Sequence, residues 1–116
     1  MSIAWPVFIK YSGEDELLFI KDESTWLADD DLSAYAYDVN DMLVDSNGVL
    51  YCFNYHVKTR QTHVKAQLKV VSIDQFEGWV KNHLALLNQC CSSKLTLLSI
   101  TEGFALLEQL SQYQDV

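Results

Sequence analysis

The sequence predicts an α+β domain in which an antiparallel β-meander is followed by a β-α-β-α segment. Side chains follow a period of two in the opening segment and in residues 49–71, and hydrophobic residues recur with a period near 3.6 in two later stretches. With 116 residues, 49% of them hydrophobic, the chain suits a single compact domain over residues 1–116. We therefore expect one mixed sheet with two main helices packed on one face.

The first expected element is a β-hairpin near the N-terminus. Side chains alternate in direction here, with Val7, Ile9 and Tyr11 on one face and Phe8 and Lys10 on the other, and a second apolar run covers residues 17–20. The segment between them contains Gly13 and other turn-forming residues. The two runs are therefore expected to pair as antiparallel strands.

Residues 22–41 follow no single pattern, and the sequence leaves their structure open. Either Asp22 or Ser24 could cap a short helix. Beyond it, Tyr35 to Asp41 alternates like a strand but contains Asp and Asn, which are poor strand formers.

A second hairpin is predicted at Asn47-Gly48. A two-residue type I′ turn needs a positive φ at both central positions, and Asn-Gly adopts it readily. With this turn, Val44 lies opposite Tyr51 and Met42 lies opposite Phe53.

The long hairpin that follows has strands over residues 49–57 and 62–71. Alternation favours a register that pairs Tyr55 with Val64, Phe53 with Ala66, Tyr51 with Leu68 and Val49 with Val70. The aromatic residues then share one face, which the helices are expected to cover. The opposite, polar face pairs Cys52 with Gln67, Asn54 with Lys65, and His56 with His63.

Two helices and one strand complete the predicted fold. Ser72 and Gln75 form a capping box before an amphipathic stretch that runs to Leu87, and Ser99 with Glu102 repeats this box before a second helix. Residues 95–98 are expected to form a strand parallel to the one before the first helix, reached by a right-handed crossover.

The chain is acidic, with 16 acidic and 8 basic residues and a net charge of -8. Residues 1–45 contain eleven acidic residues and two lysines, a net charge of -9. Proteins that bind the phosphate backbone of nucleic acids need clustered basic residues, so we expect no nucleic-acid partner. Apolar stretches fall far short of the ~20 residues that a membrane span requires, so we expect no membrane partner.

A cytoplasmic location with reduced thiols is expected. The N-terminal residues lack the pattern of a secretory signal. The three cysteines, Cys52, Cys90 and Cys91, are an odd number, and two of them are adjacent, so no disulfide framework follows.

The sequence offers few candidates for metal or nucleophilic chemistry. His56 and His63 could reach one ion, but Cys52 lies about 13 Å from His56 along the strand, and zinc needs at least three protein ligands. We therefore expect no metal and no cofactor. Cys52 is the best candidate for a reactive thiol because Lys65 shares its face, whereas Cys90 and Cys91 follow a helix C-terminus, where the dipole opposes a thiolate.

We interpret His83 and the many acidic residues as structural or solvated groups instead of catalytic ones. His83 lies on the apolar stripe of the first helix and is expected to be hydrogen-bonded at the edge of the core. The acidic residues are too numerous to single out a catalytic pair, and a charge run is more often a solvated face.

We expect a small interaction or regulatory module without catalysis, which binds a partner protein with a basic surface. An inhibitor of a basic toxin or nuclease is one version of this hypothesis. Aromatic residues combined with negative charge suit such an interface. The candidate interaction residues are Trp26, Asp29, Asp30, Asp31, Tyr35 and Tyr37.

The alternative is a small-ligand binder or an enzyme that uses the polar sheet face. Its candidate residues are Cys52, Asn54, His56, His63 and Lys65. A loop that covers this face and forms a pocket would favour the alternative, whereas an open face would favour the interaction module. The identity of the partner and the oligomeric state do not follow from the sequence.

Overall fold

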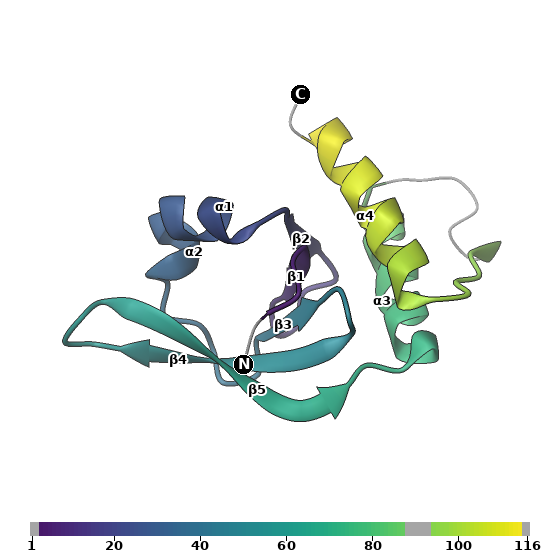
Figure 1. Ribbon diagram of the computed structural model, residues 1–116. Helices are drawn as coiled ribbons and strands as arrows, with labels where there is room; N and C mark the ends of the chain where they lie inside the picture. The colour runs from purple at the N-terminus through teal and green to yellow at the C-terminus, as the bar shows by residue number, and fades with distance from the viewer. Residues whose placement is uncertain (1–2, 88–93, 115–116) are drawn as a thin grey trace.

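The fold, seen in a computed structural model that describes residues 3–87 and 94–114, is one antiparallel five-stranded sheet flanked by helices (Figure 1). The strands are β1 (Val7–Lys10), β2 (Leu17–Ile20), β3 (Met42–Asp45), β4 (Val49–His56) and β5 (Gln61–Val70). The helices are α1 (Glu23–Ala28), α2 (Asp30–Ser33), α3 (Ile73–Leu86) and α4 (Ile100–Gln114). The predicted α+β class is confirmed. No helix in these two ranges is long and apolar enough to cross a membrane.

The strand order is β2-β1-β3-β4-β5, which differs from a simple meander. The predicted β1–β2 hairpin is present, with Phe8 opposite Phe19. However, β3 pairs with β1 instead of β2, and Phe8 also lies opposite Val44. The connection from β2 to β3 contains α1 and α2, and its length allows the chain to return on the far side of β1.

The turn between β3 and β4 is one residue longer on the β3 side than predicted. The Gly48 N–H donates to the Asp45 carbonyl at 2.8 Å, and Gly48 has a φ of +82°. The Asp45 carboxylate accepts hydrogen bonds from the N–H groups of Asn47 and Val49, both at 3.0 Å. Asp at the first position and Gly at the fourth are typical of such a four-residue turn. The prediction of a two-residue turn at Asn47-Gly48 is therefore wrong.

This difference changes the face on which side chains lie. Val44 pairs with Leu50, and Leu43 pairs with Tyr51. A shift of one residue moves side chains to the opposite face of a sheet, so Val44 and Tyr51 are on opposite sides.

The buried residues form two hydrophobic cores. The first core joins Phe8, Val44 and Leu50 of the sheet to residues of α3 and α4 such as Phe76 and Phe104. The Phe8 and Phe76 rings stack with centroids 5.3 Å apart.

The second core contains Tyr51 together with Trp26 of α1 and Leu32 of α2, and Phe53 packs against it. The prediction that the two long helices cover Tyr51 and Phe53 is therefore wrong. The two short helices cover these residues instead, as the position of α1 and α2 above the β4–β5 hairpin shows (Figure 1).

The register of β4 and β5 is as predicted at only one pair, Val49 with Val70. Beyond an irregularity it moves by two residues, so that Phe53 pairs with Val64 and Cys52 with Lys65. Leu68 has a φ of 59° within the irregular part of β5. Because the shift is even, the side chains of β4 and of residues 61–66 of β5 keep their predicted faces although their partners change. Leu68, which was predicted on the apolar face, is 88% exposed instead.

The helix starts are as predicted, but the expected strand at residues 95–98 is absent. Ser72 and Ser99 each accept a hydrogen bond at 3.1 Å from the residue three positions later, Gln75 and Glu102. The Leu97 N–H donates to the Glu77 carboxylate at 2.8 Å, and Leu97 packs into the first core. The described sheet therefore contains no parallel pair and is not mixed.

Candidate functional site

An acidic groove lies where the β1–β2 turn meets the segment before β3. It has a volume of about 760 Å³. We call this site the acidic groove. It is lined by Tyr11, Ser12, Glu14, Glu16, Tyr35, Ala36, Asp38 and Asp41. The pairing of β1 with β3 brings these two segments together, because Lys10 and Met42 are partners at the end of both strands.

Asp41 fixes the floor of the acidic groove. Its side chain is buried and accepts hydrogen bonds from the N–H groups of Ser12, at 2.6 Å, and Asp38, at 2.8 Å. The Asp41 carboxylate therefore links the β1–β2 turn to the segment before β3. The carboxylates of Glu14, Glu16 and Asp38 are on exposed residues around it.

Aromatic rings from both segments also line the acidic groove. Tyr11 stacks on Tyr37 with ring centroids 5.8 Å apart, and Tyr35 meets Tyr11 edge to face at 6.2 Å. Burial raises the pKa of Tyr11, and the negative charges of Asp41 and Glu16 add to this effect. Tyr11 is therefore a neutral phenol at physiological pH.

Tyr37 packs against Tyr11 and supports the aromatic lining of the acidic groove. Its hydroxyl donates to the Leu32 carbonyl at 2.9 Å, and its ring stacks on Phe53 with centroids 3.8 Å apart. Burial is the main cause of its raised pKa. The Thr62 hydroxyl donates to the Tyr35 carbonyl, which joins the same segment to β5.

The negative charge of the acidic groove is not neutralised within the described residues. The ion pair found in that part of the chain joins Glu77 and Lys81 of α3 at 3.3 Å, away from the groove. Lys10 lies nearby, but its ammonium group donates to the backbone carbonyl of Glu14 at 2.7 Å. A cation that entered the groove would meet the exposed carboxylates of Glu14, Glu16 and Asp38 without a competing salt bridge.

The predicted interaction residues have different environments. Asp29, Asp30 and Asp31 are exposed. Asp29 lies between the two short helices and caps α2 by accepting the Asp31 N–H at 2.9 Å, and Asp30 and Asp31 begin α2. Tyr35 is 47% exposed and lines the acidic groove.

Trp26 and Tyr37 are less exposed than an aromatic interface anchor would be, which corrects the expectation that both rings are exposed. Trp26 is only 6% exposed and stacks on Phe53, and Tyr37 is half-buried in the same stack. The sequence pattern missed Glu14, Glu16 and Asp41 as groove residues. The signal available was the three consecutive acidic residues in the predicted β1–β2 turn.

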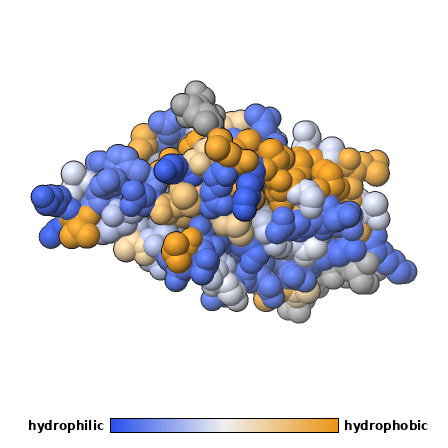
Figure 2. All heavy atoms as spheres, turned by 90° about the horizontal axis from the view of Figure 1, so that it is seen from below, coloured by the Kyte–Doolittle hydropathy of each residue, from blue (hydrophilic) through white to orange (hydrophobic). Residues whose placement is uncertain are grey.

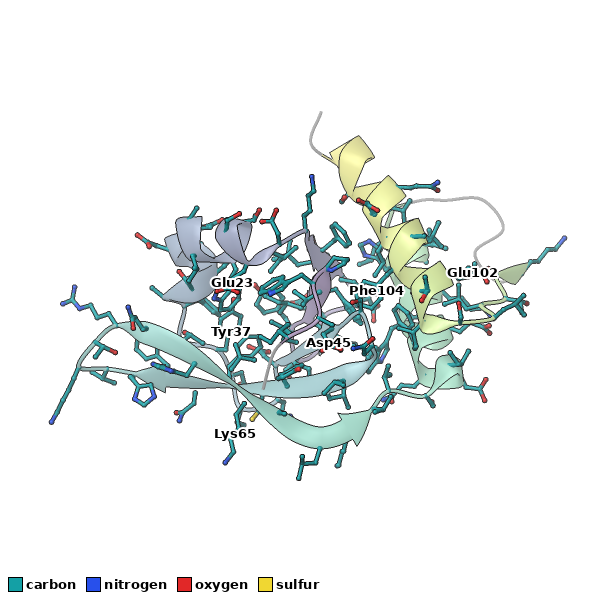
Figure 3. All side chains as sticks on the ribbon, in the orientation of Figure 1. Glu23, Tyr37, Asp45, Lys65, Glu102 and Phe104 are labelled. Atoms are coloured by element: carbon teal, nitrogen blue, oxygen red, sulfur yellow. The ribbon has the colours of Figure 1, made fainter. Side chains whose placement is uncertain are left out.

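The polar face of the β4–β5 hairpin is open. Asn54, His56, His63 and Lys65 are exposed, and Cys52 is half-buried. Lys65 projects from the hairpin on the side away from α1 and α2 (Figure 3). Seen from below, this side of the molecule is largely hydrophilic at one end, and hydrophobic residues gather toward the other (Figure 2).

The described residues contain no group of three or more His, Cys, Asp or Glu side chains that could hold a metal ion. The His56 and His63 rings do meet edge to face, with centroids 4.4 Å apart. Cys90 and Cys91 lie outside the described residues.

His83 is buried, as expected for a hydrogen-bonded histidine of the core. Its Nδ1 accepts a hydrogen bond from the Leu17 N–H at 3.1 Å. Burial lowers the pKa of His83, so the ring is neutral and this acceptor role is preserved at neutral pH. This histidine is therefore part of the scaffold that joins α3 to β2.

Comparison with known proteins gives a family and a structural relative. Residues 5–107 match the model of the DUF4144 family, which is described as "protein structure with unknown function". A solved structure titled "NMR structure of the protein from Shewanella Amazonensis" is similar, with a TM-score of 0.65 and 25% sequence identity. The similarity covers 94% of this chain and 90% of that chain. No protein with a curated description matches the sequence.

Proposed function

The chain belongs to the DUF4144 family. We propose that it is a protein-interaction module that binds a basic segment of a partner without catalysing a reaction. One observation carries the proposal. Four carboxylates line a groove with tyrosine walls, and no described Lys or Arg forms a salt bridge with them. The bound segment presents at least one arginine side chain to this groove.

Arginine suits the acidic groove better than lysine. A guanidinium group is planar, donates two parallel hydrogen bonds to one carboxylate and stacks on aromatic faces. Tyr11 and Tyr35 supply ring surfaces, and Glu14, Glu16 and Asp38 supply exposed carboxylates. Asp41 is already engaged by two backbone N–H groups, so its role is to hold the floor and add negative charge.

Long-range attraction supports the same assignment. The eleven acidic residues within residues 1–45 give this part of the chain a net charge of -9. Such a field accelerates encounter with a basic partner and weakens as salt is added. An inhibitor that covers a basic surface of a toxin or nuclease would use this field in the same way. We place this activity in the cytoplasm, where thiols such as that of Cys52 stay reduced.

The alternative site on the polar face of the hairpin has less support. Asn54 and His56 are exposed, whereas small-ligand sites bury most of the ligand surface in a cavity. An open polar face is better suited to contact with solvent or with another macromolecule.

The test is titration of the full chain with a capped, fluorescein-labelled peptide that contains two arginines in a Gly/Ala background. We expect saturable binding, followed by fluorescence anisotropy, that weakens as salt is raised from 50 to 300 mM. The Glu14→Gln/Glu16→Gln variant should bind at least about tenfold more weakly, because charge-assisted hydrogen bonds are lost.

A matched control removes the same charge elsewhere. Asp74→Asn/Glu108→Gln neutralises two exposed carboxylates that do not line the groove. If both double variants weaken binding equally, net charge rather than the acidic groove binds the peptide, and the proposal fails. It also fails if a peptide with alanine in place of both arginines binds as well.

A further inference from the structure

A second cavity lies between the N-terminal segment, α1 and β5, and it shares no lining residue with the acidic groove. Its volume is about 470 Å³, within the ~300–1,000 Å³ typical of small-molecule sites. We call it the tryptophan cavity. It is lined by Ile3, Trp5, Glu23, Trp26, Leu27, Leu43, Thr62, His63 and Val64.

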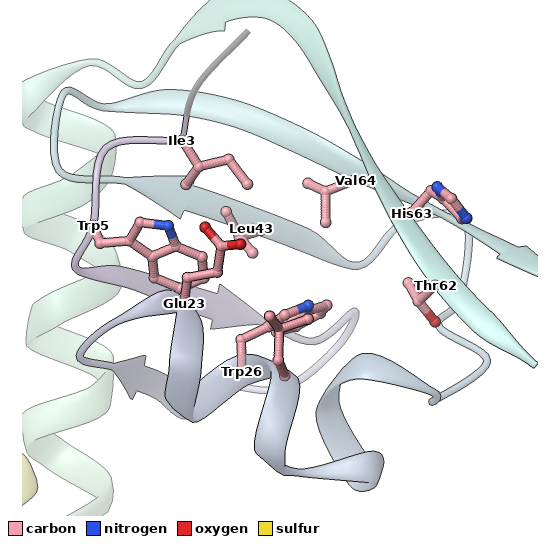
Figure 4. A pocket seen from close by; sticks show the side chains of 9 residues that line it. Ile3, Trp5, Glu23, Trp26, Leu43, Thr62, His63 and Val64 are labelled. Atoms are coloured by element: carbon pink, nitrogen blue, oxygen red, sulfur yellow. The ribbon is translucent and has the colours of Figure 1, made fainter.

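The tryptophan cavity combines aromatic and aliphatic side chains with three polar residues, Glu23, Thr62 and His63, of which Glu23 is the acidic one. Trp5, Trp26 and Leu43 surround a space into which the Glu23 carboxylate points from the first turn of α1, toward Trp5 (Figure 4). No described lysine or arginine forms a salt bridge with Glu23. The carboxylate is therefore available to a cationic group that enters the cavity.

The two indole rings add further recognition groups. No hydrogen bond joins the N–H of Trp5 or Trp26 to another described residue, and no described buried polar side-chain atom lacks a partner. Both N–H groups are therefore accessible to water or to a ligand. Indole also presents the most favourable aromatic face for a cation.

We propose that the tryptophan cavity binds a small organic ammonium ion with an apolar body, such as an arylalkylamine. The ammonium group pairs with Glu23 and lies against the Trp5 ring, and the apolar body fills the space beside Ile3 and Val64. A neutral molecule of the same shape lacks the ion pair, and an anion is repelled by Glu23. This site is separate from the acidic groove, so neither assignment depends on the other.

Phenethylamine is the probe, and the indole N–H signals of the ¹⁵N-labelled chain are the readout. The chain has three tryptophans, and the third, Trp79, packs against Phe8 in the first core instead of lining the cavity. Trp5→Phe and Trp79→Phe variants assign the three signals. We expect phenethylamine to shift the Trp5 and Trp26 signals saturably, with a dissociation constant of about 1 mM, while Trp79 stays unchanged.

Two comparisons make the test specific. The isosteric 2-phenylethanol and the anion 3-phenylpropionate should bind at least about tenfold more weakly than phenethylamine, and Glu23→Gln should weaken phenethylamine to the same degree. Glu108→Gln, which removes an exposed carboxylate of α4, should leave binding unchanged. Equal binding of the alcohol and the amine, unchanged binding to Glu23→Gln, or equal shifts of all three indole signals would each overturn the proposal.

Discussion

The Tyr51 hydroxyl donates a buried hydrogen bond of 3.1 Å to the Asp45 carboxylate, across the turn between β3 and β4. The same carboxylate accepts the N–H groups of Ala4, at 3.2 Å, and of Asn47 and Val49. Asp45 is only 1% exposed. Burial and the neighbouring carboxylate raise the pKa of Tyr51. Asp45 therefore joins the N-terminal segment, the turn and the second core through a single side chain.

We predict that Asp45→Ala lowers the free energy of unfolding by about 3–5 kcal/mol, because several donors lose a charged acceptor in a buried place. Tyr51→Phe should cost about 1 kcal/mol, the usual net value of one hydrogen bond. Urea unfolding measures both. In the Asp45→Ala background the cost of Tyr51→Phe should fall, and strict additivity of the two changes would contradict the coupling.

Two helical glycines should respond to alanine in opposite directions. An alanine Cβ at Gly78 in α3 would meet no atom within 4 Å, so Gly78→Ala should stabilise by about 0.5–1 kcal/mol. At Gly103 in α4 the Cβ would overlap Phe76 Cε2, so Gly103→Ala should destabilise by about 1–3 kcal/mol. Thermal unfolding of both variants checks this. An increase in melting temperature for Gly103→Ala would show that α4 does not pack closely on Phe76.

Local patterns predicted local structure well. The caps at Ser72 and Ser99 and the β1–β2 hairpin are all as expected, because each depends on residues a few positions apart. The apolar run at residues 95–98 was misleading, since a run of this length suits a strand or a packed loop equally. Its backbone N–H groups bind the side chains of Glu77 and Glu102 instead of a strand.

Features that depend on distant segments were not predictable in this way. Asn47-Gly48 favours a tight turn locally, but the Asp45 carboxylate accepts the N–H groups of a longer one. In the register that goes with this turn, Tyr51 pairs with Leu43 and both lie in the second core. The acid excess of residues 1–45 was plain from composition. Four of these acidic residues, Glu14, Glu16, Asp38 and Asp41, line one groove. This arrangement requires Ser12 and Asp41 to meet, and they do so because β3 pairs with β1.

His83 should make stability depend on pH in the weakly acidic range. Its ordinary pKa is 6.5, and burial lowers it in the folded chain. The unfolded chain therefore takes up a proton first as pH falls below 6.5, which favours unfolding. We expect the free energy of unfolding to be highest above pH 6.5 and to fall by up to about 1.4 kcal/mol per pH unit below it.

Urea unfolding between pH 5.5 and 7.5 tests this dependence. His83→Gln should flatten the slope, because glutamine can accept the Leu17 N–H without titrating. His56→Gln serves as the control, since His56 is exposed, and it should retain the slope of the natural chain. The same slope in His83→Gln would assign the pH dependence to another group.

The last prediction is that the chain does not bind nucleic acid, although Lys58, Arg60 and Lys65 are exposed on the β4–β5 hairpin. Binding of single strands combines a basic groove with aromatic rings that stack on bases. Here Tyr51 and Phe53 pack into the second core under the short helices, and Lys65 projects from the opposite face (Figure 3). The basic groups and the aromatic rings therefore cannot contact the same strand.

The net charge of -8 also repels a polyanion at long range. We expect dissociation constants weaker than about 10⁻⁴ M, the weak end of non-specific binding, for single- and double-stranded oligonucleotides near physiological salt. Fluorescence anisotropy with labelled oligonucleotides measures this directly. Micromolar binding that weakens steeply with added salt, and that is lost in a Lys58→Gln/Lys65→Gln variant, would instead make the hairpin a nucleic-acid site.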